Sequence, residues 1–156
     1  MRVVPTTLLA QSIIGAALVL AFPASAAEIL DGPVPARVTE VIDGDTLAVE
    51  VRIWLGQDLS TRVRLAGVDA PELRGGCLEA RALAKRAKRW LSNLVGGATV
   101  MLSDIQFGKY AGRIVARVAT PGGRDLSTAL IDAGLGRATP DGARADWCPA
   151  SPATDR

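Results

Sequence analysis

Five short segments rich in Val, Ile, Leu and Thr, each bounded by turn-forming residues, limit the possible folds of this chain most strongly. They cover residues 36–42, 46–55, 60–68, 98–105 and 113–119. Two segments with apolar residues at helical spacing interrupt them, at 77–95 and 125–135. We therefore expect a mainly β fold with some α: a five-stranded OB-fold barrel, of Greek-key type, with two packed helices. A β-sandwich is the alternative, but it would need about two further strands.

The first 26 residues have the pattern of a cleavable signal peptide. Arg2 precedes an apolar run at 8–22, and the segment ends in the small-residue sequence ASA. An uncleaved membrane anchor is the alternative, although Gln11 and Ser12 interrupt an apolar run that is short for a span of roughly 20 residues. We expect an exported protein, in the periplasm or outside the cell, with no stable membrane association after cleavage.

The chain that remains after cleavage has about 130 residues, which is enough for one domain. We expect a mature N-terminal leader at 27–35, one domain at 36–138 and a coil tail at 139–156, in a monomeric protein. Loss of the signal peptide leaves 17 basic against 16 acidic residues, because Arg2 is the only charged residue in that segment. Such a chain has no global charge to attract a polyanion, so any recognition of phosphate must be local.

Histidine is absent, which excludes an imidazole as acid, base or metal ligand. Acid–base chemistry would have to come from carboxylates, Lys, Tyr or metal-bound water. The two cysteines, Cys77 and Cys148, favour one disulfide in an oxidising compartment, which would tether the C-terminal tail near Glu72. Two unrelated buried thiols are the alternative.

Three short motifs carry the charged residues with possible chemistry. The stretch IDGDT places Asp43 and Asp45 around a glycine, a pattern that a hairpin turn alone explains. The stretch VRLAGVDAPEL, at 63–73, carries Arg64, Asp69 and Glu72. Because side chains alternate along a strand, Arg64 is expected to be available to solvent on the face opposite Leu65. The third motif, FGKYAGRIVARV, carries Lys109, Tyr110 and Arg113.

These three motifs, in this order, resemble the staphylococcal nuclease (thermonuclease-like) family. The family's marks are I-D-G-D-T, R-L-x-x-V-D-x-P-E and a K-Y-G-R-like stretch, and the resemblance covers about residues 36–138. Known members fold as an OB barrel with packed helices, and the active ones use calcium to cleave phosphodiester bonds of DNA and RNA. The resemblance implies the same fold, cofactor and substrates here, with cleavage that leaves a 3′-phosphate.

The resemblance also implies a metal site. Asp45 and Asp69 stand at the positions of the family's two metal-ligating carboxylates, and Asp43 at that of an aspartate beside the metal. Ala70 replaces a threonine whose main-chain carbonyl completes the protein ligands, and alanine keeps that carbonyl. Oxygen ligands of this kind suit a hard cation such as calcium.

The remaining roles implied by the resemblance concern the substrate. Glu72 matches the family's candidate general base, while Arg64 and Arg113 match two arginines that grip the phosphate bidentately. Lys109 and Tyr110 are expected to contact the substrate. The sequence KYAGR has one residue more than KYGR, and we align it on Arg113 because the apolar strand begins directly after it.

Two other classes of function remain as alternatives. The first is a non-catalytic OB-fold module that binds nucleic acid in a groove by stacking, which predicts aromatic residues on the strands and loss of the charged motif positions. The second is an exported structural or interaction domain, since a fold does not determine a function. The mature chain has few aromatic residues and keeps the charged positions, so we favour the enzyme.

Overall fold

The computed structural model describes residues 28–74, 76–109, 112–140 and 144–148. The expected signal peptide at 1–26, the predicted substrate residue Tyr110 and the end of the tail at 149–156 lie outside these residues. Within the described ranges, no helix is both long and apolar enough to span a bilayer.

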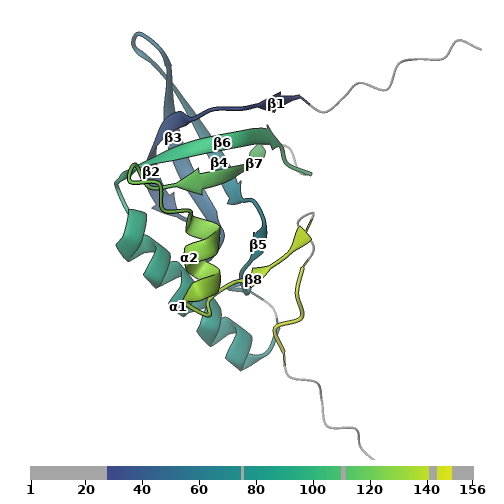
Figure 1. Ribbon diagram of the computed structural model, residues 1–156. Coiled ribbons are helices and arrows are strands. Elements are labelled where there is room, and N and C mark those ends of the chain that lie inside the picture. The colour runs from purple at the N-terminus through teal and green to yellow at the C-terminus, as the bar shows by residue number, and fades with distance from the viewer. Residues whose placement is uncertain (1–27, 75, 110–111, 141–143, 149–156) are drawn as a thin grey trace, which may run out of the picture.

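Five strands form a closed barrel (Figure 1). In spatial order they are β2 (Val34–Val41), β3 (Thr46–Trp54), β4 (Gln57–Leu65), β7 (Arg113–Ala119) and β6 (Thr99–Phe107). The barrel closes because β6 pairs with both β2 and β7. The β4–β7 pair is parallel and the other pairs are antiparallel. This arrangement confirms the expected OB-type barrel, and the β-sandwich alternative is wrong.

The five expected strands are all present, with ends shifted by a few residues. Three two-residue strands were not expected: β1 (Ile29–Leu30), β5 (Val68–Asp69) and β8 (Arg137–Ala138). β1 pairs with β6, and β5 pairs with β8. The β5–β8 pair matters most for the site, because it brings Asp69 beside the C-terminal part of the chain (Figure 1).

Both expected helices are present. α1 (Leu78–Val95) begins directly after Cys77 and lies against one end of the barrel (Figure 1). Its buried side is made largely of small residues, which let the helix approach closely. α2 (Leu126–Asp132) is capped by Asp125, whose side chain accepts a hydrogen bond from the N–H of Thr128 at 2.8 Å.

The core fills the barrel and its junction with the helices. Apolar side chains alternate along the strands, as a sheet with one buried face requires. The largest fully buried residues are Val38, Leu47, Val49, Val63, Leu65, Val68, Leu91, Val95, Val100, Leu102, Leu126 and Leu130. This core fixes the ends of β3 and β4, from which the charged motif residues extend.

Candidate active site

The turn between β2 and β3 is closed by Asp43. Its Oδ1 accepts a hydrogen bond from the backbone N–H of Asp45 at 3.0 Å. The N–H groups of Ile42 and Asp43 both donate to the carbonyl of Thr46. An aspartate that bonds to the backbone two residues further on stabilises a tight turn. Asp43 therefore orders the turn that presents Asp45.

Gly44 allows this turn to approach two other segments closely. A Cβ at this position would lie 2.7 Å from the Cβ of Ala70 and 2.9 Å from that of Ala87 in α1. Both distances are well below normal carbon–carbon contact. The glycine is needed for this approach, which places the turn against the residue that follows Asp69.

Asp45 and Asp69 are joined by Arg64. Its Nη1 donates to Asp45 Oδ1 at 2.8 Å and its Nη2 donates to Asp69 Oδ1 at 3.0 Å. Asp45 also accepts hydrogen bonds from the Thr46 hydroxyl and the Ala70 N–H, both at 3.0 Å. The two aspartates are each 3% exposed and Arg64 is 8% exposed. The planar fork of one guanidinium thus holds two buried carboxylates together.

The prediction that the Arg64 side chain would be exposed to solvent is wrong, because Arg64 is buried. Leu65 faces the core as expected, but the opposite face of β4 is covered at this end by Asp45 and Asp69. Buried carboxylates require a counter-charge, and Arg64 supplies it. Strand alternation predicted the face correctly, but it could not show what covers that face.

Glu72 lies outside the buried cluster. Its Oε1 is 3.0 Å from Nη1 of Arg144, and the two side chains are 46% and 64% exposed. Exposed ion pairs of this kind contribute only about 0–1 kcal/mol to stability. Glu72 therefore remains accessible to water and substrate, while the ion pair with Arg144 restricts the orientation of its side chain.

A basic cleft of about 670 Å³ opens beside Arg64. Its charged lining residues are Arg64, Lys109, Arg113 and Arg144, with Gln106 and Phe107 beside them. Four cations around one cleft form a local positive site in a nearly neutral chain, as the sequence required for phosphate recognition. The structure thus brings the predicted residues Arg64, Lys109 and Arg113 to one cleft.

Arg144 was missed by the sequence analysis. It is shared between the basic cleft and a smaller cavity of about 260 Å³ that is lined by Asp69, Ala70 and Glu72 among others. Its position four residues before Cys148 was the only available signal, because the predicted disulfide would place this part of the tail near the Glu72 loop.

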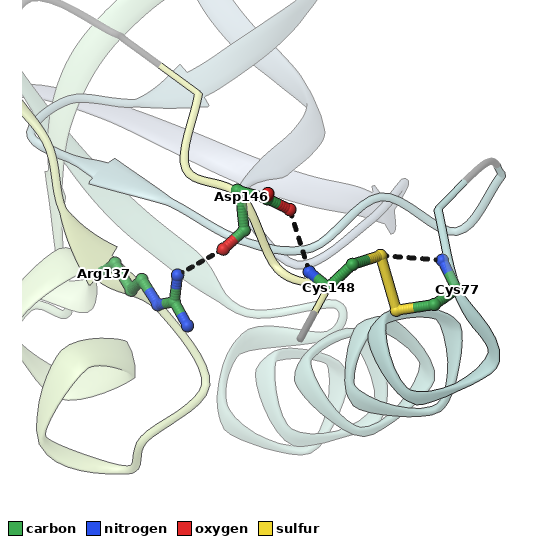
Figure 2. The surroundings of a disulfide bond; sticks show 4 residues. All are labelled: Cys77, Arg137, Asp146 and Cys148. Carbon is green, nitrogen blue, oxygen red and sulfur yellow. Dashed lines mark hydrogen bonds between the residues drawn. A yellow bond between two sulfur atoms is a disulfide. The ribbon is translucent and has the colours of Figure 1, made fainter. Parts of the chain in front are cut away.

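The predicted disulfide between Cys77 and Cys148 is present, with the two Cα atoms 5.7 Å apart (Figure 2). It tethers the tail next to the site, as expected. The sequence did not predict that this tail contacts Asp69. The Oδ2 of Asp69 accepts hydrogen bonds from the N–H of Ala145 at 3.1 Å and from Nε1 of Trp147 at 2.9 Å.

The sequence matches a family of known proteins over the segment that contains most of this site. The family model described as staphylococcal nuclease homologue matches residues 62–146. The chain belongs to this family. The matched segment includes Arg64, Asp69, Glu72 and Arg113, whereas Asp45 precedes it and joins the site through its contacts with Arg64 and Ala70.

Three curated relatives of this chain are named probable endonuclease LCL3. The protein of Clavispora lusitaniae is 36% identical over 83 residues, which cover 51% of this chain and 35% of the relative. Those of Meyerozyma guilliermondii and Scheffersomyces stipitis are 34% and 35% identical over 83 residues, covering 51% of this chain and 36% and 35% of their own lengths. This chain therefore spans about a third of the curated relatives it matches.

The donors present fit the calcium ion that the staphylococcal nuclease family implies. Asp45, Asp69 and the carbonyl of Ala70 offer oxygen, which hard cations prefer. Two buried carboxylates share a single guanidinium, so when both are ionised the cluster carries a net negative charge that a cation would balance. The described residues contain no group of three or more His, Cys, Asp or Glu side chains that could hold a metal. Two carboxylates and a carbonyl would leave other positions to water or substrate.

The pKa of Asp45 is raised to about 7, chiefly by burial and also by the neighbouring Asp43 carboxylate, while Arg64 and the hydrogen bonds from Ala70 and Thr46 oppose the shift. Between about pH 4 and pH 7 the folded protein therefore keeps a proton on Asp45 that the unfolded chain has released. We expect this group to lower the free energy of unfolding as the pH rises through that window, by up to about 4 kcal/mol.

The measurement is urea denaturation in chelator at pH 4.5 and pH 7.5, for the wild type and for Asp45→Asn. The wild type should lose more stability than the variant between the two pH values, because only the wild type has this titrating group. Calcium added at pH 7.5 should restore wild-type stability by binding the folded state. If the free energy of unfolding changed equally with pH in the two proteins, the raised pKa of Asp45 would be contradicted.

Proposed function

We propose that this protein is a calcium-dependent nuclease that hydrolyses phosphodiester bonds of DNA, RNA or both. The observation that carries the proposal is the position of Arg64, which holds Asp45 and Asp69 together at the wall of a basic cleft. Membership of the staphylococcal nuclease family supports it, as do the printed names of the three relatives.

The basic cleft would bind the scissile phosphate. Arg64 and Arg113 would donate to its non-bridging oxygens, and Lys109 would contribute a further positive charge. Negative charge on these oxygens grows as water attacks phosphorus. Donors that are already in place stabilise that charge, each typically by about 3 kcal/mol.

Glu72 would orient the attacking water and accept its proton. The water oxygen forms a new bond to phosphorus, and the bond from phosphorus to the 5′-oxygen breaks. The 5′-oxygen then takes up a proton from solvent, and the product keeps a 3′-phosphate. The exposure of Glu72 and its contact with Arg144 are consistent with a base that reaches a water at the mouth of the site.

Asp45, Asp69 and the carbonyl of Ala70 would hold calcium, with Asp43 ordering the turn beside it. The ion would supply a Lewis acid that polarises the phosphate and lowers the pKa of nearby water. Asp45 and Asp69 are buried and fixed by several hydrogen bonds, so they would bind the ion with little reorganisation.

We further propose that the protein is exported and acts as a monomer outside the cytoplasm. The Cys77–Cys148 disulfide supports this location, because such bonds persist in oxidising compartments. The signal-peptide pattern at 1–26 remains a prediction.

Chelation should abolish cleavage. Purified protein would be incubated with single-stranded DNA and, separately, with RNA, in calcium and in excess chelator, and the products would be resolved on a gel. Cleavage in calcium alone is expected, and end-labelling should detect 3′-phosphate termini. Undiminished cleavage in chelator would disprove the metal assignment, and the two substrates would reveal any preference.

One observation supports the alternative function, a non-catalytic module that binds nucleic acid. Phe107 is 81% exposed beside the basic cleft, where a base could stack on its ring. The same assay separates the two functions, because a binding module would retain nucleic acid in a gel-shift experiment without cutting it.

A further inference from the structure

Residues 144–148 form a C-terminal strap across the acidic side of the site. Its backbone and side chains reach Asp69 and Glu72, the two motif residues that lie on either side of Ala70 and Pro71. Figure 2 shows the end of the strap, where Cys148 meets Cys77 at the start of α1. The strap thus approaches the site from a different part of the chain than β3 and β4.

Among the residues that the structure describes, two of the three donors to the Asp69 carboxylate come from this strap. The Ala145 N–H and the Trp147 indole N–H both donate to Oδ2, while Arg64 donates to Oδ1. Asp69 is 3% exposed, so these donors replace water around the carboxylate. The direction in which its oxygens point is therefore determined largely by the strap.

The strap is itself held at several points. The disulfide fixes its end, and the N–H of Cys148 donates to Oδ1 of Asp146 at 3.0 Å. Arg137 of β8 donates to the carbonyl of Asp146 and places its guanidinium 4.2 Å from the centre of the Trp147 ring (Figure 2 shows the Arg137–Asp146 contact). These contacts hold the indole beside Asp69.

We propose that Trp147 is a positioning residue for Asp69 and that the Cys77–Cys148 disulfide maintains it in place. The inference rests on the proposed function, in which Asp69 binds calcium. A ligand whose orientation is set before the ion arrives binds that ion more tightly, because less order must be imposed on binding. Trp147 touches neither metal nor substrate in this proposal, and it acts only through Asp69.

The expected effect is on calcium affinity. Loss of a hydrogen-bond partner behind a metal ligand typically weakens metal binding about 10- to 100-fold. Trp147→Phe removes the indole N–H but keeps an aromatic ring beside Arg137, so the packing of the strap is largely conserved. Trp54→Phe is the matched control, since Trp54 is 69% exposed at the end of β3.

The first measurement is calorimetric titration of each purified, metal-free protein with calcium chloride. We expect the dissociation constant to rise at least about tenfold for Trp147→Phe and to stay unchanged for Trp54→Phe. Cleavage by Trp147→Phe should require correspondingly more calcium, with an unchanged KM for single-stranded DNA. If Trp147 has only a structural role, Trp147→Phe should lower the melting temperature and leave the calcium dissociation constant unchanged.

The second measurement tests the disulfide through a double-mutant cycle. Cys77→Ser/Cys148→Ser should weaken calcium binding by a similar factor, because the strap is no longer fixed. Trp147→Phe added to the protein without the disulfide should reduce calcium affinity little further, because the effects of coupled substitutions are not additive. Full additivity would overturn the claim that the disulfide acts through Trp147.

The outcomes separate this inference from the proposed function. If the wild type binds calcium and cleaves DNA, and Trp147→Phe matches Trp54→Phe in both measurements, the positioning role is wrong and the nuclease proposal stands. If the wild type neither binds calcium nor cleaves, the proposed function fails and this inference fails with it.

Discussion

Arg64→Ala is expected to lower the turnover of nucleic acid by about two orders of magnitude or more, with a smaller effect on KM. The variant loses a donor to the phosphate and the bridge between Asp45 and Asp69. An interaction that strengthens as charge develops affects turnover more than substrate binding. The measurement is steady-state cleavage of single-stranded DNA at saturating calcium, with kcat and KM determined separately.

The same substitution should also destabilise the protein. Removal of one partner from a buried ion pair leaves uncompensated charge and typically costs about 3–5 kcal/mol. Arg64→Lys is therefore the second variant, because it keeps a positive charge near the two carboxylates. A single ammonium cannot reproduce the planar fork, so Arg64→Lys should remain folded and still lose most of its turnover. Urea denaturation would confirm that each variant is folded under assay conditions.

Arg81→Ala is the control for Arg64→Ala. Arg81 is an exposed cation on α1, outside the lining of the basic cleft. Its loss should change the salt dependence of cleavage slightly and leave kcat nearly unchanged. Equal, small effects of Arg64→Ala and Arg81→Ala on cleavage would show that the motif arginine is not catalytic, and the binding module would become the better account.

The barrel could be predicted from the sequence because its signals are local. Alternating apolar residues mark the strands, Asp43 marks a turn, and Asp125 marks the start of α2. The two-residue strands β5 and β8 could not be predicted, because two residues carry no periodicity. Their pairing depends on where the finished barrel places the chain.

The site was only partly predictable for a related reason. The resemblance placed Asp45, Asp69 and Arg64 in one site, and the structure brings them into direct contact. Nothing local showed that the two aspartates bury Arg64, since they are 19 and 5 residues away in sequence. The contacts of Trp147 were missed because its partner, Asp69, is 78 residues distant. Such contacts follow from tertiary packing and the disulfide, which the residue pattern does not encode.

Glu72→Gln is expected to reduce turnover by about two orders of magnitude or more, because general-base catalysis typically contributes about 10²–10⁴-fold. The amide has almost the same shape as the carboxylate but cannot accept the proton of the attacking water. Stability should change by less than about 1 kcal/mol, since the substitution breaks only an exposed ion pair with Arg144. The measurements are kcat on single-stranded DNA and urea denaturation of the same preparation.

The split between kcat and KM distinguishes a base from a residue that merely shapes the loop. Loss of a base should lower kcat with little change in KM, whereas a loop-shaping role should raise KM and leave kcat near the wild-type value. Glu79→Gln is the matched control, because Glu79 is an exposed carboxylate in the first turn of α1. It should retain the wild-type kcat and KM. A near-normal kcat for Glu72→Gln would contradict the role of Glu72 as the base and would leave proton transfer to solvent.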